Sequence, residues 1–513
     1  MRIERAQNAT RNIIFGVFLK VYQILFPFLM RTVMIYSLGV QYLGLNSLYA
    51  SILQVLNLAE LGVGSAMVFS MYEPIAHDDR TKVCALMRLY RLYYRAIGLI
   101  IAVIGLLVLP VVPKLISGEI PSDVNVYVLY LINLSSTVLS YWLFAYKNSI
   151  LQAHQRNDII SKVTLLTSTF QYILQIGALW LFKSYYLYIL VQLLTQAITN
   201  VLTAIIASKI YPDFVPSGKL DVKEVHMINQ RIKDLFTSKV GAVIVNSADS
   251  IVISAFLGLT VLAVYQNYYF ILTSVIGIVE VVFTACTAGI GNSLIVEDQK
   301  KNFADLKKFT CIISVIAGSC SSCLLNMYQP FIKVWLGENM MLDYAAVICF
   351  CVYYYVYEIN RILNTYKDAG GIWHKDRFRP LVTALANLMM NLLLVRFWGV
   401  YGVILSTVLS MLLVGMPWII KNIFSTLFAR DESKQYVVLL LKYAGVSLLG
   451  CVLTFFLCSY ISIDGFGGLA TRLLVCMVVV PVLFYLFFRK TEEFIASTKL
   501  IIQVLKTIQR HGR

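Results

Sequence analysis

The stretch SLGVQYLGLNSLYASIL (residues 37–53) recurs as FLGLTVLAVYQNYYFIL (256–272), at an offset of 219 residues. A weaker pair, FKSYYLYILVQL (182–193) and FWGVYGVILSTV (397–408), repeats at an offset of 215. Both members of the first pair join one long apolar run to the next. Internal repeats of whole bundles are the usual construction of secondary transporters. We therefore expect two pseudo-symmetric six-helix bundles, followed by two further helices.

The apolar runs that flank these stretches set the fold class. The chain has 513 residues and is 59% hydrophobic but only 14% charged, whereas soluble domains carry about 25% charged residues. Apolar runs of about 18 residues or more are long enough to cross a bilayer as helices, and lipid excludes open sheets. The sequence therefore predicts an all-α polytopic membrane protein with about 14 transmembrane helices. We place them at 13–36, 43–71, 87–110, 125–148, 159–182, 185–208, 238–258, 262–290, 308–330, 343–366, 379–396, 400–420, 436–459 and 467–488.

The basic residues predict the orientation of these helices. With an even number of spans and the N-terminus inside, only five of the 43 Lys and Arg residues fall on the outer side: Lys114, Lys183, Lys333, Arg396 and Arg472. Positive charge on inner loops is the strongest topology signal in membrane proteins. We therefore expect both termini in the cytoplasm. The same bias accounts for most of the net charge of +16, so no nucleic-acid partner is expected.

The runs and loops also predict the domain boundaries. Residues 1–210 form an N-terminal six-helix bundle and 238–425 a C-terminal one. Between them, residues 211–237 contain apolar side chains at helical spacing with charges between them, which predicts a cytoplasmic amphipathic linker. Residues 426–513 hold helices 13 and 14 and an amphipathic cytoplasmic tail.

The first span carries two positive charges and a proline. Lys20 and Arg31 are about three helical turns apart, so they share a face, and Pro27 near that face is expected to act as a hinge that bends the helix. A charge at mid-membrane is costly unless it faces a wet cavity or a partner. We predict a cavity wall, with the alternative that Arg31 extends its guanidinium to the interface.

Further cations mark two other spans. In MRLYRLYYRAIG (87–98), Arg88, Arg91 and Arg95 fall at i, i+3 and i+7 on one face, where they either bind substrate or anchor the helix end. Arg361 lies three residues after Glu358 in the tenth span, at a spacing that allows an ion pair.

Acidic and amide groups within spans are candidates for coupling or for neutralising these cations. They are Glu60, Asn246, Asp249, Glu280 and Glu358, and the repeat aligns Glu60 with Glu280 to within one residue. Carboxylates at matching places in two halves suggest counter-ions for arginine or sites for H⁺ or Na⁺.

The chemistry implied by this inventory is anion transport. Arginine binds phosphate bidentately at any pH, so the expected substrate is phosphorylated. The sequence contains no GxxxxGKS nucleotide-binding motif and no catalytic constellation, and Cys320 and Cys323, although spaced as CxxC, lie within an apolar run. We therefore expect a transporter without a cofactor or resident metal rather than an enzyme, with a non-transport scaffold as an alternative.

Several stretches resemble a known family. They are LNLAELGVGSA (56–66), YEPIAHDD (72–79), SADSIVISAFLGLTVLAVYQNYYFI (247–271), QPFIKVWLGE (329–338), LNTYKDAGGIWHKDRFRPLVTALANLMMNLLLV (363–395) and WGVYGVILSTVLS (398–410). Together they resemble polysaccharide repeat-unit flippases of the Wzx type, over about residues 8–425. These proteins belong to the multidrug/oligosaccharidyl-lipid/polysaccharide exporter superfamily.

This resemblance implies two bundles around a cavity that opens alternately inward and outward. It implies export of an undecaprenyl-diphosphate-linked oligosaccharide across the bacterial plasma membrane, by a monomer that works beside a polysaccharide polymerase and glycosyltransferases. Related lipid II flippases carry an arginine before a glycine at the first helix junction, which Arg31 and Gly39 match, and use their last two helices as a lipid-tail groove. The alternatives are a multidrug or cation antiporter, whose cavity would be acidic, and a flippase for lipid II or a teichoic-type precursor.

Overall fold

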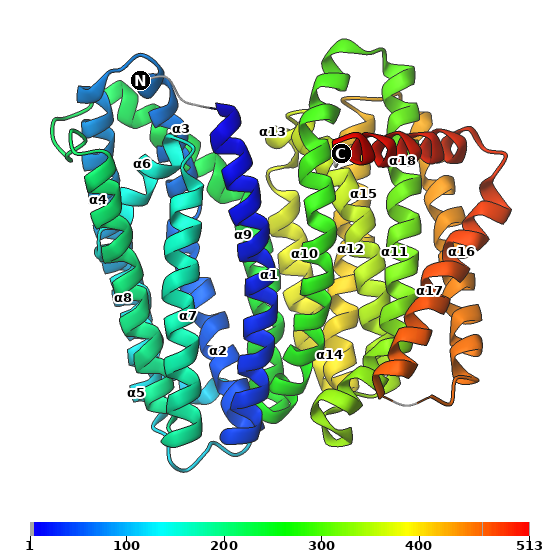
Figure 1. Ribbon diagram of the computed structural model, residues 1–513, viewed down its shortest axis with the longest axis horizontal. Coiled ribbons are helices and arrows are strands. Elements are labelled where there is room, and N and C mark those ends of the chain that lie inside the picture. Colours follow the sequence, from blue (N-terminus) through cyan, green and yellow to red (C-terminus); the bar gives the residue numbers. More distant parts are fainter. Residues whose placement is uncertain (1–4, 464, 512–513) are drawn as a thin grey trace. The chain divides into compact units, whose positions relative to one another are not determined.

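The computed structural model describes residues 5–463 and 465–511. Every regular element in these ranges is helical (Figure 1). By contacts between residues, the chain forms two compact units, residues 1–263 and 264–513. The outermost residues of the expected first and last domains, 1–4 and 512–513, lie outside the described ranges, as does residue 464.

The described part of the N-terminal unit is built from long α-helices joined by short 3₁₀ turns. They are α1 (Arg5–Ser37), α2 (Val40–Leu56), η1 (Asn57–Glu60), α3 (Val63–Ala76), α4 (Arg80–Val108), η2 (Leu109–Leu115), α5 (Val126–Trp142), η3 (Ala145–Lys147), α6 (Asn148–Ala153), α7 (Asn157–Leu181), α8 (Tyr185–Ile210) and α9 (Val222–Leu257). Polar side chains cap several of them: Asp79 accepts a hydrogen bond from the Lys82 amide at the start of α4, and Asn125 caps α5.

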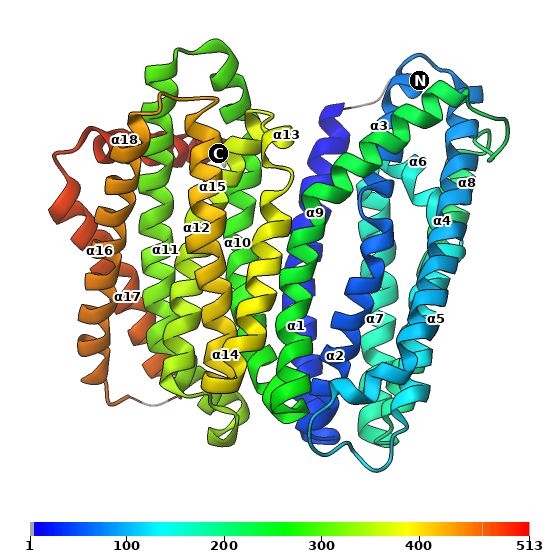
Figure 2. The same cartoon turned by 180° about the vertical axis from the view of Figure 1, so that it is seen from behind.

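The C-terminal unit begins within α10 and holds the remaining elements. They are α10 (Leu259–Val296), α11 (Gln299–Leu336), η4 (Glu338–Met340), α12 (Tyr344–Ala369), α13 (Trp373–Asp376), α14 (Arg379–Ser410), the π-helical turn η5 (Met411–Gly415), α15 (Met416–Phe424), α16 (Glu432–Ser459), α17 (Gly465–Phe488) and α18 (Glu492–His511). Both views place α16 and α17 at the same edge of this unit (Figures 1 and 2).

The repeated junctions have the same backbone geometry in both copies. Gly39 between α1 and α2 has φ 117° and ψ 168°, and Gly258 between α9 and α10 has φ 89° and ψ 172°. These values lie in the region that side chains with a Cβ avoid, which explains why both copies place glycine there. Gly118 and Gly337, also 219 residues apart, have φ values of 79° and 89°. The internal repeat thus extends to a second junction.

The expected spans map onto long apolar helices. In the described ranges, 11 helices are long and apolar enough to cross a membrane, or up to 12 if the bent pair Val126–Trp142 and Ala145–Ala153 is one span. With the bent pair counted, the difference between 12 and 14 has two sources. The expected span 159–182 lies in α7, which is absent from this set, and the spans 379–396 and 400–420 form one helical stretch, Trp373–Phe424. Gly399 interrupts that stretch with φ 57° and ψ −134°. The protein is therefore a multi-pass, all-helical membrane protein.

Both amphipathic segments form helices. Residues 222–237 of the linker form the first part of α9, which continues without a break into the next apolar run and packs against α2 and α3. Residues 211–221 form a loop before this helix. The tail forms α18, which lies across α11 (Figure 1). There the Lys307 ammonium is 3.0 Å from a Glu493 carboxylate oxygen, and the Ser497 hydroxyl donates to the Lys308 carbonyl.

The last two apolar helices pack against α11. Tyr443 of α16 and Phe484 of α17 are fully buried beside Cys311 of α11. Polar pairs fix the register: the hydroxyls of Ser322 and Thr454 are 2.7 Å apart, and the Asn326 amide donates to Thr454. In lipid, packing and hydrogen bonds of this kind hold helices together. This arrangement positions α16 to form one wall of the cavity described below.

Candidate functional site

Arg31 lies in α1, the helix that packs against α7. It is partly buried, and the Tyr188 hydroxyl of α8 is near enough to interact with its charge. Earlier along α1, Phe26 and Tyr22 pack against the ring of Tyr172 in α7. The Arg31 guanidinium therefore lies near the phenol of Tyr188 from α8.

The other two residues predicted in α1 have simpler surroundings. Lys20 is exposed. Pro27 lies inside α1, which continues from Arg5 to Ser37, so the proline does not end the helix. A bend at Pro27 remains a prediction.

The arginines of α4 contact neighbouring loops. The Arg88 guanidinium donates a 2.8 Å hydrogen bond to the Gly218 carbonyl in the α8–α9 connection. The Arg91 guanidinium lies 5.8 Å from the Tyr146 ring centre in η3. The Arg95 side chain is exposed. The contacts of Arg88 and Arg91 are those of helix anchors, so a substrate contact by this group remains a hypothesis.

Glu60 lies where an apolar helix pair is interrupted. It ends η1, and Gly62, with φ 88°, separates it from α3. The Tyr94 hydroxyl of α4 donates to the Glu60 carboxylate at 3.3 Å, and the Tyr90 hydroxyl donates to Tyr94 at 2.5 Å. The aligned Glu280 instead lies within the continuous helix α10. The two copies of the repeat therefore differ locally around these carboxylates.

Asn246 and Asp249 occupy different environments on α9. Asn246 is exposed and Asp249 is buried. Two serines next to Asp249 in the sequence, Ser247 and Ser250, are also buried. The structure therefore separates these two candidates by exposure.

Arg361 of α12 brings two predicted acids together. Its guanidinium is 3.4 Å from a Glu280 carboxylate oxygen of α10 and 3.7 Å from Glu358 Oε1 of α12. It also donates to the Ile276 carbonyl at 3.2 Å and lies over the rings of Phe283 and Tyr357. Of the predicted residues, these three form one charged cluster within the C-terminal unit.

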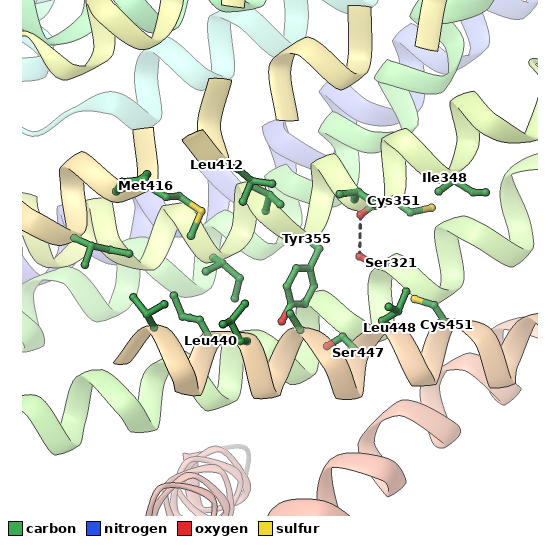
Figure 3. Close-up of a pocket in the computed structure, with 18 of the residues that line it drawn as sticks. Ser321, Ile348, Cys351, Tyr355, Leu412, Met416, Leu440, Ser447, Leu448 and Cys451 are labelled. Atoms are coloured by element: carbon green, nitrogen blue, oxygen red, sulfur yellow. Dashed lines mark hydrogen bonds between the residues drawn. The ribbon is translucent and has the colours of Figure 1, made fainter. Parts of the chain in front are cut away.

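A cavity of about 1500 Å³ opens in the C-terminal unit between α11, α12, α15 and α16. Figure 3 shows Tyr355 reaching from α12 toward α16, near Ser447. We call this cavity the C-terminal groove. Its wall is largely apolar and includes Ile348, Tyr355, Leu412, Met416, Leu440 and Leu448.

Two cations lie at one end of the C-terminal groove. Lys421 at the end of α15 and Arg430 before α16 both line it and are exposed. Among the described residues, neither has an ion-pair partner. Neither was predicted as a site residue, because a cation in an inner loop is first of all a topology signal.

A buried polar cluster in α14 was also missed. The Asn387 side-chain amide donates to the Thr407 hydroxyl at 2.9 Å, and the Ser406 hydroxyl donates to the side-chain Oδ1 of Asn391. The spacing of Asn387 and Asn391, four residues apart in an apolar run, is the signal that could have found it. Within the described ranges, no group of three or more His, Cys, Asp or Glu side chains could hold a metal ion.

Comparisons with known proteins fit this architecture. The model of the family described as "Polysaccharide biosynthesis protein" matches residues 9–288. A search of curated proteins found no match.

Solved structures share the fold at low identity. One is a lipid II flippase MurJ in an inward closed conformation, with 15% identity, a TM-score of 0.64, and coverage of 93% of this chain and 99% of that chain. A second is an inward-facing multidrug resistance MATE family transporter of the MOP superfamily, with 13% identity, a TM-score of 0.64, and coverage of 80% and 96%. The Vibrio cholerae MATE transporter VcmN in the bent form matches with 15% identity, a TM-score of 0.52, and coverage of 82% and 98%. These neighbours are transporters and a flippase rather than enzymes.

The family match covers more than half of the sequence, so the chain belongs to the polysaccharide biosynthesis protein family and has the helical fold of the MOP superfamily.

Proposed function

We propose that this protein is a flippase for an undecaprenyl-diphosphate-linked oligosaccharide. It moves the lipid-linked repeat unit from the inner to the outer leaflet of the bacterial plasma membrane by alternating access. The product would feed capsule, O-antigen or exopolysaccharide synthesis, with a polymerase and glycosyltransferases as partner enzymes. The membership of the polysaccharide biosynthesis family supports the substrate class.

The observation that carries the proposal is the C-terminal groove. A polyprenyl tail is long and wholly apolar, and this groove offers a large, largely apolar volume between membrane helices. A diphosphate is anionic, and among the described residues Lys421 and Arg430 lie at one end without an ion-pair partner. Basic pockets between transmembrane helices are a common way to hold anionic lipid head groups.

Arg31 is the proposed contact for the diphosphate during passage. A guanidinium keeps its charge at any physiological pH and binds phosphate oxygens bidentately. Lys20, Arg88, Arg91 and Arg95 are secondary candidates in the same unit, and Arg361 in the other. The coupling ion is H⁺ or Na⁺, with Glu60, Asn246, Asp249, Glu280 and Glu358 as candidate sites.

The test of the groove uses two matched leucines. Leu448 lines the groove and is 66% exposed, whereas Leu474 on α17 is 67% exposed but does not line it. We expect Leu448→Trp to fill the groove and reduce export of the surface glycan, in cells that lack the native copy. Leu474→Trp should export normally. Membrane blotting would confirm equal protein levels.

A groove that only holds ordinary lipid predicts a different result. In that case Leu448→Trp would export as well as Leu474→Trp, and the proposal for the tail would be wrong. Accumulation of the lipid-linked intermediate in the inner leaflet of the Leu448→Trp strain would place the defect at the flipping step.

A second candidate function is a multidrug or cation antiporter. It is favoured by the two acids near Arg361, Glu358 and Glu280, and by the structural match to a MATE transporter. Such a protein would protect cells from cationic drugs. Drug resistance that depends on this protein, with normal glycan export after its deletion, would favour the antiporter.

A further inference from the structure

Glu358 is a carboxylate buried in the centre of a membrane helix without a hydrogen bond. Its exposed fraction is 0%, and neither carboxylate oxygen has a hydrogen-bond partner among the described residues. Buried polar groups are hydrogen-bonded in the great majority of structures. An ionised carboxylate without such partners is strongly destabilising in an apolar environment.

The charges around Glu358 do not neutralise it. Arg361 is the cation beside it, but its guanidinium is shared with Glu280, which lies closer, at 3.4 Å against 3.7 Å. Arg361 also donates to the Ile276 carbonyl, so its hydrogen-bonding geometry is directed toward α10. One positive charge thus faces two carboxylates, and the half-exposed Glu280 holds it better than the buried Glu358.

Besides Arg361 and Glu280, the titratable groups of the described residues near Glu358 are neutral side chains. Tyr354 and Tyr357 lie on its own helix, and Cys320 faces it from α11. Across from it on α10 stands Glu280. The Tyr354 hydroxyl is itself buried without a hydrogen-bond partner in the described structure. This set can share a proton, and in the described part of the chain no group of three or more His, Cys, Asp or Glu side chains could hold a metal ion.

We propose that Glu358 is a proton-binding site, and that its protonation decides which of two carboxylates holds Arg361. The role of this proton as the coupling ion rests on the proposed transport function. The proton site itself rests on the geometry around Glu358. In the arrangement seen here, Glu358 carries the proton and is neutral, and Arg361 ties α12 to α10 through Glu280 and the Ile276 carbonyl.

Loss of the proton would reverse this preference. The proton passes from a Glu358 oxygen to water, which leaves a carboxylate in a low-dielectric environment beside the guanidinium. A charge-assisted hydrogen bond is much stronger there than in water. The guanidinium would then turn toward Glu358, and Glu280, which is 54% exposed, would be released to solvent. The link between α10 and α12 would thus depend on protonation.

The direct test is infrared spectroscopy of the purified full-length protein in lipid nanodiscs. A protonated carboxyl absorbs apart from a carboxylate, so wild type should show a protonated carboxyl band at neutral pH that Glu358→Gln removes. Glu493→Gln is the matched control, because Glu493 is paired with Lys307 and should remain ionised. A band that persists unchanged in Glu358→Gln, or its absence in wild type, would overturn the inference.

A second measurement tests the switch itself. Spin labels on α10 and α12 should report a distance that changes with pH in wild type. In Glu358→Gln, which mimics the protonated state, the distance should stay at its low-pH value. Glu358→Asp should restore pH dependence. A pH-dependent distance in Glu358→Gln would show that another group controls the contact. Neither measurement uses the glycan, so failure of the flippase proposal leaves both results interpretable.

Discussion

At the scale of single residues, Arg31 connects the sequence most directly to the proposed chemistry. It is a fixed positive charge within an apolar helix, partly buried and near the Tyr188 hydroxyl. A snorkelling anchor needs only a long cationic side chain. A diphosphate contact also needs the fork of the guanidinium.

Substitution of Arg31 distinguishes these roles. We expect Arg31→Ala to abolish most glycan export and Arg31→Lys to reduce it partly, because a bidentate charge-assisted contact contributes about 1.5–3 kcal/mol. Export would be measured in cells that lack the native copy, with membrane levels checked by blotting. Near-normal export by Arg31→Ala would identify the arginine as an interfacial anchor.

Asp158 is a structural rather than a functional charge. Its side chain is fully buried. The carboxylate Oδ1 is 2.9 Å from Arg156 Nε, and Oδ2 is 3.3 Å from the Lys162 ammonium. Burial alone raises the pKa of the Asp158 carboxyl, but the hydrogen bonds and charges of Arg156 and Lys162 outweigh it and hold the pKa below its ordinary value. A lowered carboxyl pKa stabilises the folded state above the unfolded pKa of about 3.9, and this contribution is lost as pH falls through the folded value.

We therefore expect Asp158→Asn to lower the free energy of unfolding at pH 7 by about 1–3 kcal/mol. The difference from wild type should shrink as pH falls below about 4, because the unfolded wild-type chain then binds a proton at Asp158, and it should vanish once pH falls below the lowered pKa of the folded carboxyl. Asp213→Asn is the control: its partner Arg80 and Asp213 itself are both exposed, so the loss should be below about 1 kcal/mol. Thermal unfolding in detergent across this pH range is the measurement. Equal losses for both variants would contradict the structural role of Asp158.

At the scale of elements, the break between α2 and α3 is the feature that separates the two copies of the repeat. Gly62 adopts φ 88°, and an added Cβ would lie 2.7 Å from the Leu235 Cβ on α9. The break therefore depends both on glycine and on a close approach by α9. It places the Glu60 carboxylate against Tyr94 and Tyr90 of α4.

Loss of the Tyr94 hydroxyl should weaken this element. We expect Tyr94→Phe to destabilise the protein by about 1–3 kcal/mol, because Glu60 loses a donor and the Tyr90 hydroxyl loses its acceptor. Tyr93→Phe is the matched control, since Tyr93 bonds to Asn229 in an exposed position and water can replace that bond. Thermal unfolding of both variants in detergent gives the comparison. A larger loss for Tyr93→Phe would mean that the contact between Glu60 of η1 and Tyr94 of α4 does not support the fold.

At the scale of the whole molecule, the orientation in the membrane follows from charge. Only five of the 43 Lys and Arg residues fall on the predicted outer side, which predicts that both termini are cytoplasmic. Green fluorescent protein fused after residue 513 should therefore fluoresce, and alkaline phosphatase at the same place should be inactive. Active phosphatase at the C-terminus would show that the C-terminus lies outside. The predicted topology and the proposed direction of transport would then both be wrong.

The sequence alone determined the membrane class, the repeat and its junctions. Long apolar runs are read directly from composition, and Gly39 and Gly258 show the same special backbone geometry because no other residue adopts it without strain. Periodicity also found the amphipathic parts of α9 and α18.

Only the tertiary structure decided which charges meet. Glu60 and Glu280 align in sequence, yet one hydrogen-bonds a phenol in a broken helix and the other pairs with Arg361. Spacing along α12 indicated that Glu358 could contact Arg361, but not that Glu358 is fully buried without a hydrogen bond in the described structure. The resemblance implied a groove at the last two helices, but not that Lys421 and Arg430 line a cavity between α11, α12, α15 and α16, because these helices are far apart in the sequence. Helical periodicity fixes the face a side chain occupies, whereas the packing of other helices on that face fixes its partners and its burial.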